Sequence, residues 1–274
     1  MTRSDDTVTD TGSALFDVRE FARTAQGSHR AELAELDLDS ARLPSDVVRL
    51  IRILRDLERS TMQRMRNLLV TATHKDARVT AFLTTWAFER FWIADALDFV
   101  LETTGEPLAD PEAAGKPRRS LSERAERRGP IRRAISAGFA GPQLVAAHVT
   151  TGLVDEWVTS AAYRKLATAA SGLSSVVDLI TSIKERHIRF LSEETQRRLA
   201  ESERAQKLTR RELSRSVWPI GAVETGAGDR SFFEQFVFGT TDGRAEAGRI
   251  SALIAALPGI GPGAAATVNA RLVP

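Results

Sequence analysis

The sequence predicts an all-α protein. Apolar residues recur at steps of three and four over long stretches of the 274-residue chain, which is the spacing of one helix face. Gly occurs 18 times and Pro 10 times, fewer than a β protein with many turns needs. Together these patterns predict four long helices, at residues 45–72, 77–103, 142–170 and 173–206.

The first two helices are defined by their ends as well as by their apolar faces. Pro44 precedes Ser45 and Asp46, which we expect to cap the helix over 45–72. His74, Lys75 and Asp76 form the predicted turn, and the sequence Thr103–Gly105 followed by Pro107 ends the helix over 77–103.

The two helix pairs differ in how they are connected. The links inside each pair are short, which forces antiparallel hairpins, whereas the link over 105–141 is long and interrupted by prolines. A long link between two hairpins allows a crossover, which an up-down-up-down bundle would not need. This crossover contains one short predicted helix at 120–128. Its segment 116–133 has eight basic and two acidic residues, interpreted as a solvated loop rather than an anion-binding site.

The two ends of the chain differ in composition and in predicted structure. Residues 1–14 are polar and are expected to form a disordered tail before a helical bundle over 15–216. Residues 217–274 are predicted to form a helical extension packed on the bundle, with helices at 230–238, capped by Asp229, and at 243–257.

Composition excludes several kinds of chemistry and location. With no Cys, the chain has no disulfide, no zinc–thiolate site and no thiol nucleophile. Neither a membrane span nor a secretory signal is predicted, so a cytoplasmic location is expected.

Ionisable residues lie near the middle of each predicted helix, inside its apolar face. They are Glu58, Glu89 with Arg90, Glu156, and His187. Charged groups in such positions are costly unless they are paired or bind a metal. The coincidence in all four helices therefore predicts a polar site at the bundle centre.

The segments around these residues, LRDLERS, TTWAFERFWIADAL, TTGLVDEWVTSAAYRKLA and IKERHIRFL, resemble the ferritin-like superfamily of di-iron carboxylate proteins. The resemblance is strongest to its desaturase-like and oxygenase-like bacterial branch, and covers residues 45–206. It implies a ferritin-like four-helix bundle with a dinuclear iron or manganese centre. In such a centre two helices each supply a Glu and the other two each supply a Glu-x-x-His pair. The resemblance implies that Glu58, Glu156 and His187 are metal ligands.

The other implied ligand positions have changed. Arg90 and Ile93 replace the Glu-x-x-His pair of the second helix, and Lys184 replaces the Glu that pairs with His187. The favoured hypothesis is a degenerate centre in which Glu58 and Glu156 pair with Lys184 and Arg90, and iron or manganese is absent or partial. Such a protein would be a scaffold that binds a small apolar ligand or a protein partner, as a homo-dimer.

Two alternatives remain open for the same residues. The first is an active non-haem di-iron or Mn/Fe oxidoreductase, acting as an oxygenase or oxidase through the shifted ligands Glu89 and Glu185. The second is a helical bundle of another family with accidental interior Glu and His residues.

Several further residues are candidates for supporting roles. Tyr163 and Thr159 follow Glu156 on one helix face, and His148 shares a face with Asp155, as a possible second metal or proton-relay pair. A buried Tyr or His with a single hydrogen bond is the simpler interpretation. The remaining two histidines, His29 and His74, are expected to be exposed. Trp86, Trp92 and Trp157 are expected to pack in the bundle.

The segment LPGIGPGAAATV at 257–268 resembles a helix-hairpin-helix, a motif that offers backbone amides to a DNA phosphate. Gly259 and Gly261 would allow the close approach. Because no Lys or Arg directly follows the turn, a simple helix end is favoured over DNA binding.

Overall fold

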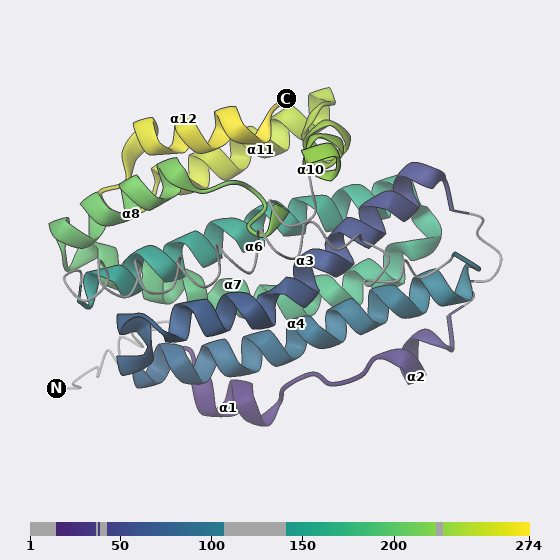
Figure 1. Cartoon of the computed structure of the whole chain (residues 1–274), viewed down its shortest axis with the longest axis horizontal. Helices are drawn as coiled ribbons and strands as arrows, with labels where there is room; N and C mark the ends of the chain where they lie inside the picture. Colours follow the sequence, from purple (N-terminus) through teal and green to yellow (C-terminus); the bar gives the residue numbers. More distant parts are fainter. Residues whose placement is uncertain (1–14, 37, 39–42, 107–140, 223–226) are drawn as a thin grey trace, which may run out of the picture.

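The computed structural model describes residues 15–36, 38, 43–106, 141–222 and 227–274 (Figure 1). Within these ranges all regular secondary structure is helical, so the all-α prediction is confirmed. The predicted tail over 1–14, the short helix over 120–128 and the basic segment 116–133 lie outside the described residues.

Two long hairpins form the centre of the molecule. Helix α3 (Ser45–Leu69) packs against α4 (Ala77–Thr103), with the 3-10 turn η1 (Ala72–Lys75) between them. Helix α6 (Gln143–Ala169) packs in the same way against α7 (Ser174–Ala200), through the turn η2 (Ser171–Leu173). The hairpins also contact each other, α3 with α6 and α4 with α7. The predicted antiparallel pairing of helices is therefore confirmed.

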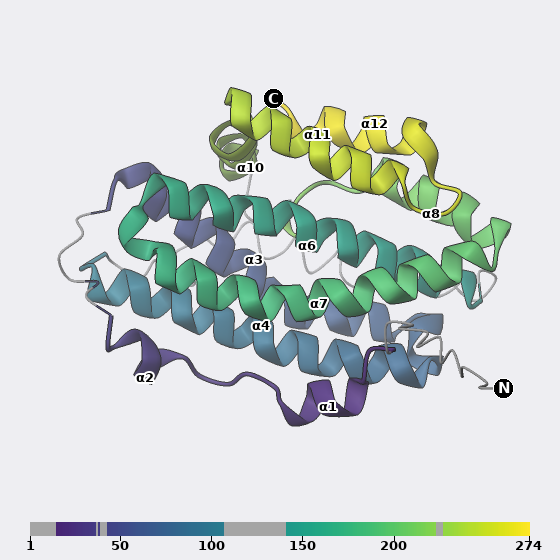
Figure 2. The same ribbon diagram turned by 180° about the vertical axis from the view of Figure 1, so that it is seen from behind.

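Helix α4 and helix α6 run in the same direction. The side chain of Thr73 in η1 is hydrogen-bonded to His148 near the start of α6, with 2.8 Å between Oγ1 and Nδ1. This contact places the start of α6 at the turn between α3 and α4, whereas α4 ends at the opposite end of the bundle (Figures 1 and 2). Residues 104 and 141 are consequently separated by the length of the bundle.

The first two long helices begin with different kinds of N-cap residue. Asp76 caps α4 by accepting a hydrogen bond from the amide of Val79 at 3.0 Å. The predicted cap of α3 by Ser45 and Asp46 is wrong, because Pro44 is the N-cap residue and Ser45 is already in the first helical turn.

The predicted helix over 173–206 is two helices. Helix α7 ends at Ala200, and α8 (Glu203–Arg215) begins after Ser202, whose extended backbone breaks the helix. The Ser202 hydroxyl caps α8 by accepting a hydrogen bond from the Ala205 amide at 3.2 Å. Helix α8 then packs on α6 and α12, so the chain turns back at this break.

The C-terminal helices form a layer over the bundle (Figure 1). Helix α10 (Ala227–Phe233) continues as a π-helical turn, η3 (Glu234–Phe238), and is followed by the hairpin of α11 (Thr241–Ala255) and α12 (Gly261–Leu272). Asp229 lies in the first turn of α10, where it pairs with Arg49 of α3 at 2.8 Å. The division into domains at residue 217 stays a prediction.

The N-terminal segment lies along α4 (Figure 2). Its two short helices are α1 (Val18–Arg23) and α2 (Arg30–Leu33). Phe16 and Phe21 join Phe82 of α4 and Phe190 of α7 in one aromatic cluster. The predicted exposure of His29 is wrong. His29 is the N-cap residue of α2, which packs on α4, and it is only 4% exposed. His74 is exposed, as expected.

No helix in the described ranges combines the length and the apolar character needed to cross a membrane.

Candidate functional site

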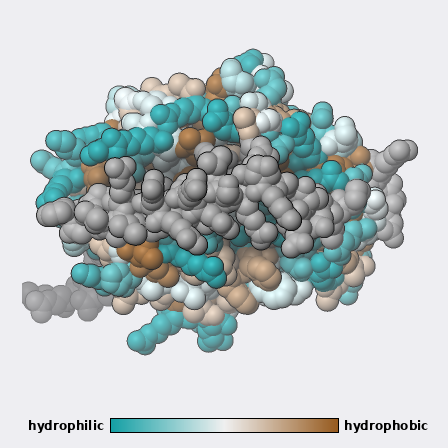
Figure 3. All heavy atoms as spheres, viewed as in Figure 1, coloured by the Kyte–Doolittle hydropathy of each residue, from teal (hydrophilic) through white to brown (hydrophobic). Residues whose placement is uncertain are grey.

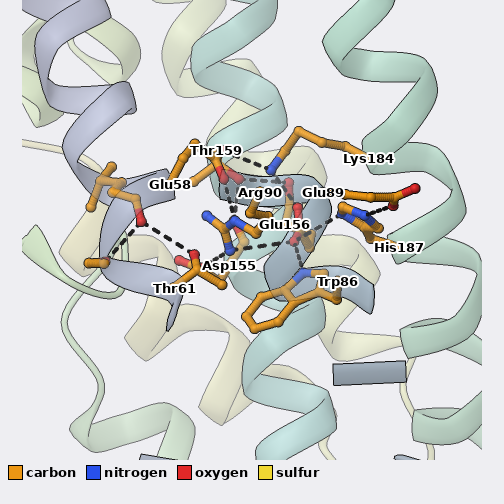
Figure 4. Close-up of polar contacts among 12 residues, drawn as sticks. Glu58, Thr61, Trp86, Glu89, Arg90, Asp155, Glu156, Thr159, Lys184 and His187 are labelled. Atoms are coloured by element: carbon orange, nitrogen blue, oxygen red, sulfur yellow. Dashed lines mark hydrogen bonds and ion pairs between the residues drawn. The ribbon is translucent and has the colours of Figure 1, made fainter. Parts of the chain in front are cut away.

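The ionisable residues predicted at the middle of the four long helices meet at the centre of the bundle (Figure 4). Helix α3 supplies Glu58, α4 supplies Glu89 and Arg90, α6 supplies Glu156, and α7 supplies Lys184 and His187. Each of these side chains is at most 1% exposed. The three-residue spacing of Lys184 and His187 places both on one face of α7, toward the same interior.

Lys184 links the two carboxylates that the resemblance implies as metal ligands. Its Nζ lies 2.5 Å from Oε2 of Glu156 and 3.3 Å from Oε1 of Glu58. The ammonium group therefore connects α7 to both α3 and α6.

Arg90 completes the same ion-pair network from α4. Its Nε donates a hydrogen bond to Glu58, and its Nη1 lies 3.5 Å from Oε1 of Glu156. The pairing of Glu58 and Glu156 with Lys184 and Arg90 that the sequence predicts is present. Ile93, one helical turn further along, is fully buried and adds no polar atom.

His187 and Glu89 form a second pair beside this network. The Nε2 of His187 lies 2.7 Å from Oε2 of Glu89, and its Nδ1 lies 3.7 Å from Oε1 of Glu156. The other oxygen of Glu89 accepts a hydrogen bond from the Gln26 amide at 2.8 Å and lies 3.2 Å from Nη1 of Arg186. The N-terminal segment thus closes the side of the site where Glu89 lies.

Glu185 does not belong to the site. Its side chain is exposed, because one residue along a helix turns the side chain by about 100° away from the face of Lys184. The hypothesis of shifted ligands is therefore wrong for Glu185, whereas Glu89 does face the interior.

Sequence reasoning missed two groups that hold the site together. Asp155 accepts hydrogen bonds from Arg64 at 2.6 Å and from the Ile220 amide at 2.8 Å, and lies 3.6 Å from Arg90. Trp86, assigned to packing alone, donates from Nε1 to Glu156 at 2.7 Å. The signal available was that a buried indole N–H needs an acceptor.

The charges of the cluster balance without an added ion. Four carboxylates (Glu58, Glu89, Asp155 and Glu156) are paired with four basic side chains (Arg64, Arg90, Lys184 and Arg186). Within the described part of the chain, no group of three or more acidic or His residues is arranged to hold a metal ion. Iron and manganese need carboxylate and imidazole ligands. Here the ammonium group of Lys184 and the guanidinium group of Arg90 form ion pairs with the carboxylate oxygens that would bind a metal. The residues present do not fit a dinuclear metal centre.

The cations determine the ionisation of the two central carboxylates. Burial by itself would raise the pKa of Glu58, but Arg90 and Lys184 outweigh it and leave this pKa below its ordinary value. The pKa of Glu156 is held well below its ordinary value because Lys184 and Arg90 again outweigh burial. Both carboxylates are consequently ionised at neutral pH.

The residues predicted to support the site, Tyr163, Thr159 and His148, form hydrogen bonds within the bundle. The hydroxyl of Tyr163 donates to Oε1 of Glu58 at 3.1 Å, and burial raises the pKa of this phenol well above 10. The hydroxyl of Thr159 donates to the Asp155 carbonyl at 2.9 Å. His148 contacts Thr73 at the end of the bundle, about 10 Å along α6 from Asp155, so these two residues do not form a relay pair.

The glycine turn between α11 and α12 lies far along the chain from this site and packs on α8. Gly259 has a φ of +66° and lies so close to Gln206 that an added Cβ would be 2.0 Å from its side chain. The Gly259 carbonyl accepts a hydrogen bond from Arg210. Gly261 has a φ of +72° and faces open space.

No protein-family model matches the chain, and no curated protein or solved structure matches it either.

Replacing Lys184 with Met should destabilise the fold by about 3–5 kcal/mol, because it leaves Glu58 and Glu156 buried with one cation fewer. Urea denaturation at pH 7 measures this loss, with exposed Lys75→Met as the control. The double variant Lys184→Met/Glu156→Gln should lose less than the sum of the single changes, because the two groups interact. A loss below about 1 kcal/mol for Lys184→Met would contradict the network described.

The network should also make stability depend on pH in the acid range. Because the folded pKa values of Glu58 and Glu156 lie below the 4.5 of a free Glu, their contribution is complete above pH 4.5. It is then lost as the pH falls through the folded values. Denaturation midpoints measured from pH 7 to pH 3 should fall less steeply in Glu156→Gln than in the wild type. The control Glu185→Gln, at an exposed position, should keep the wild-type slope. Equal slopes in all three proteins would refute the assignment.

Proposed function

We propose that this chain is a ferritin-like four-helix bundle related to the di-iron carboxylate oxidoreductases, in which two of its own cations replace the metal centre. It functions as a scaffold that binds a protein partner or a small ligand, not as an oxidoreductase. The observation that carries the proposal is the position of the Lys184 ammonium, 2.5 Å from Glu156 and 3.3 Å from Glu58. A metal ion bridging these carboxylates would need the same space.

The arrangement of the helices supports the ferritin-like part of the proposal. A bundle of that kind has two antiparallel hairpins and one long crossover. Helices α3 and α4 form one hairpin here and α6 and α7 the other, and the end of α4 is a bundle length away from the start of α6 (Figure 1).

The replacements themselves support a change of role rather than a random loss of ligands. Two of the three substituted residues, Arg90 and Lys184, are cations, and each contacts the two retained carboxylates. Since removing metal ions from a carboxylate cluster leaves uncompensated negative charge, these two side chains supply the missing positive charge. The bundle then stays folded without a cofactor.

The outer face of α4 supports the partner-binding part. Phe88 and Phe91 are 43% and 51% exposed, and both rings contact that of Trp92, with centroids 6.2 and 5.2 Å apart. Trp92 itself is half-buried, so the exposed part of this cluster is formed by the two Phe rings, and exposed aromatic side chains are typical of a surface that another protein covers. We propose that this aromatic face, Phe88, Phe91 and Trp92, forms a homo-dimer interface.

Elemental analysis tests the absence of metal. Protein produced in medium supplemented with iron and manganese should hold less than about 0.1 metal ion per chain, because the ligand set is blocked by cations. The variant Arg90→Glu/Ile93→His/Lys184→Glu restores the implied ligands and should take up about two metal ions per chain. The control Arg90→Gln/Ile93→Ala/Lys184→Gln removes the cations without supplying a carboxylate or an imidazole, and should take up none.

Two metal ions per chain in the wild type would overturn the proposal. If the restored variant gained none, the alignment of Arg90, Ile93 and Lys184 with metal-ligand positions would be wrong.

Sedimentation velocity tests the proposed dimer. The wild type should sediment as a dimer, and Phe88→Asp/Phe91→Asp as a folded monomer, because charged side chains at the centre of an interface are strongly unfavourable. Leu253→Asp on α11, where the side chain is 47% exposed, is the matched control and should remain dimeric. A monomeric wild type would refute the dimer, as would a dimer that survives the Phe88→Asp/Phe91→Asp change.

A further inference from the structure

The N-terminal segment covers the side of the interior site where Glu89 lies. We call residues 24–36 the strap; it runs from the end of α1 through α2 and lies along α4 (Figures 1 and 2). The Gln26 amide donates to Oε1 of Glu89 at 2.8 Å, while Oε2 of the same carboxylate pairs with His187 at 2.7 Å (Figure 4). The strap therefore covers one oxygen of a carboxylate whose other oxygen belongs to the site.

The strap and the helix before it are held to the bundle by different kinds of contact. Phe16 and Phe21, at either end of α1, pack on Phe82 of α4 with ring centroids 6.4 and 5.3 Å apart. The outward side of α1 is hydrophilic, at the lower edge of the molecule in Figure 3. The strap is held largely by charge, as in the pair of Arg30 with Asp95 at 2.9 Å. Because only the second kind of contact responds to ionisation, the strap can detach while α1 stays docked.

His29 occupies an apolar position in the strap. It lies one helical turn before Leu33, so both side chains face α4, and they are 4% and 1% exposed. Nε2 of His29 is buried and has no hydrogen-bond partner among the described residues, and its Nδ1 lies 4.0 Å from the carboxylate of Glu32. An imidazole in such a position is accommodated when neutral and is costly when charged.

The charged groups around His29 do not compensate for a proton on it. The nearby carboxylates are Glu32 on α2 and Glu89 and Asp95 on α4. The two on α4 are already paired with basic side chains, which are Arg30, Arg186 and His187. The side chain of Glu32 is 65% exposed, so water and salt screen its charge. Burial therefore outweighs these carboxylates and lowers the pKa of His29 below its ordinary value of 6.5.

From these contacts we propose that the strap is a pH-controlled cover of the interior site, closed while His29 is neutral and open when His29 takes up a proton. In the open form the imidazolium is solvated, the Gln26 amide leaves Glu89, and α1 stays docked through its aromatic rings. Opening gives solutes access to Glu89 and His187 from outside. The proposal rests on the position of the strap, and not on whether cations have replaced a metal centre.

The sign of the pH dependence follows from the burial of His29. The closed form binds the proton more weakly than the open form, so acid favours opening. The effect is absent above pH 6.5 and grows as the pH falls below 6.5 toward the folded pKa of His29. This range lies above pH 4.5, where the contribution of Glu58 and Glu156 is still complete, so the two effects are separable.

Hydrogen–deuterium exchange of the full chain at pH 7.5 and 5.5 measures the opening, after correction for the intrinsic pH dependence of amide exchange. In the wild type, protection of the amides in residues 24–33 should fall about three- to tenfold at pH 5.5, while peptides from α6 and α7 stay unchanged. His29→Gln is neutral at both pH values and should keep its protection. The control His74→Gln, at an exposed position, should respond as the wild type does.

Two further variants test the role of the charge itself. His29→Arg carries a positive charge at both pH values, so its strap should already be open at pH 7.5. His29→Leu fills the buried position with an apolar side chain and replaces His29→Gln in the comparison if the strap does not accommodate the amide.

Four outcomes would overturn the proposal. The first is equal protection of the wild-type strap at both pH values. The second is a wild-type response in both neutral variants, which would assign the titration to another group such as His187. The third is full protection of His29→Arg at pH 7.5. The fourth is an equal loss of protection in α6 and α7, which would mean that the whole bundle opens.

Discussion

The contact of Lys184 with Glu58 and Glu156 is the interaction on which the interior of this protein depends. All three side chains are buried, and a buried charge without a partner costs several kcal/mol. Each partner comes from a different helix, so the ion pairs form only when α3, α6 and α7 are in register. Arg90 adds α4 to the same constraint. Apolar packing brings the four helices together, and the ion pairs select one arrangement among those that packing would allow.

The same cluster also binds the two segments that precede and follow the four long helices. Glu89 accepts a hydrogen bond from the Gln26 amide of the N-terminal segment, and Asp155 accepts one from the Ile220 amide beyond α8. These backbone groups are satisfied by carboxylates that also pair with buried cations. A change in the central charges is therefore expected to reach both segments, although neither is part of the four long helices.

Positive charge in the interior of the bundle is balanced by the chain's own carboxylates. In the interior every cation is matched by a carboxylate, so the cluster is stable without an added ion. The proposed scaffold role follows from this balance of charge.

The sequence by itself determined the helical class, the hairpin pairing and the residues at the bundle centre, because apolar periodicity and mid-helix charges report which face is buried. It also predicted that Lys184 and Arg90 pair with Glu58 and Glu156. Only the tertiary structure decided which neighbour of each charged residue points inward: Asp155 joins the network beside Glu156, while Glu185 beside Lys184 is exposed. The break at Ser202 and the docking of Gly259 on α8 were likewise undetermined. Local patterns describe one helix at a time, whereas the rotation of each helix and the partners of its side chains are set by packing against the others.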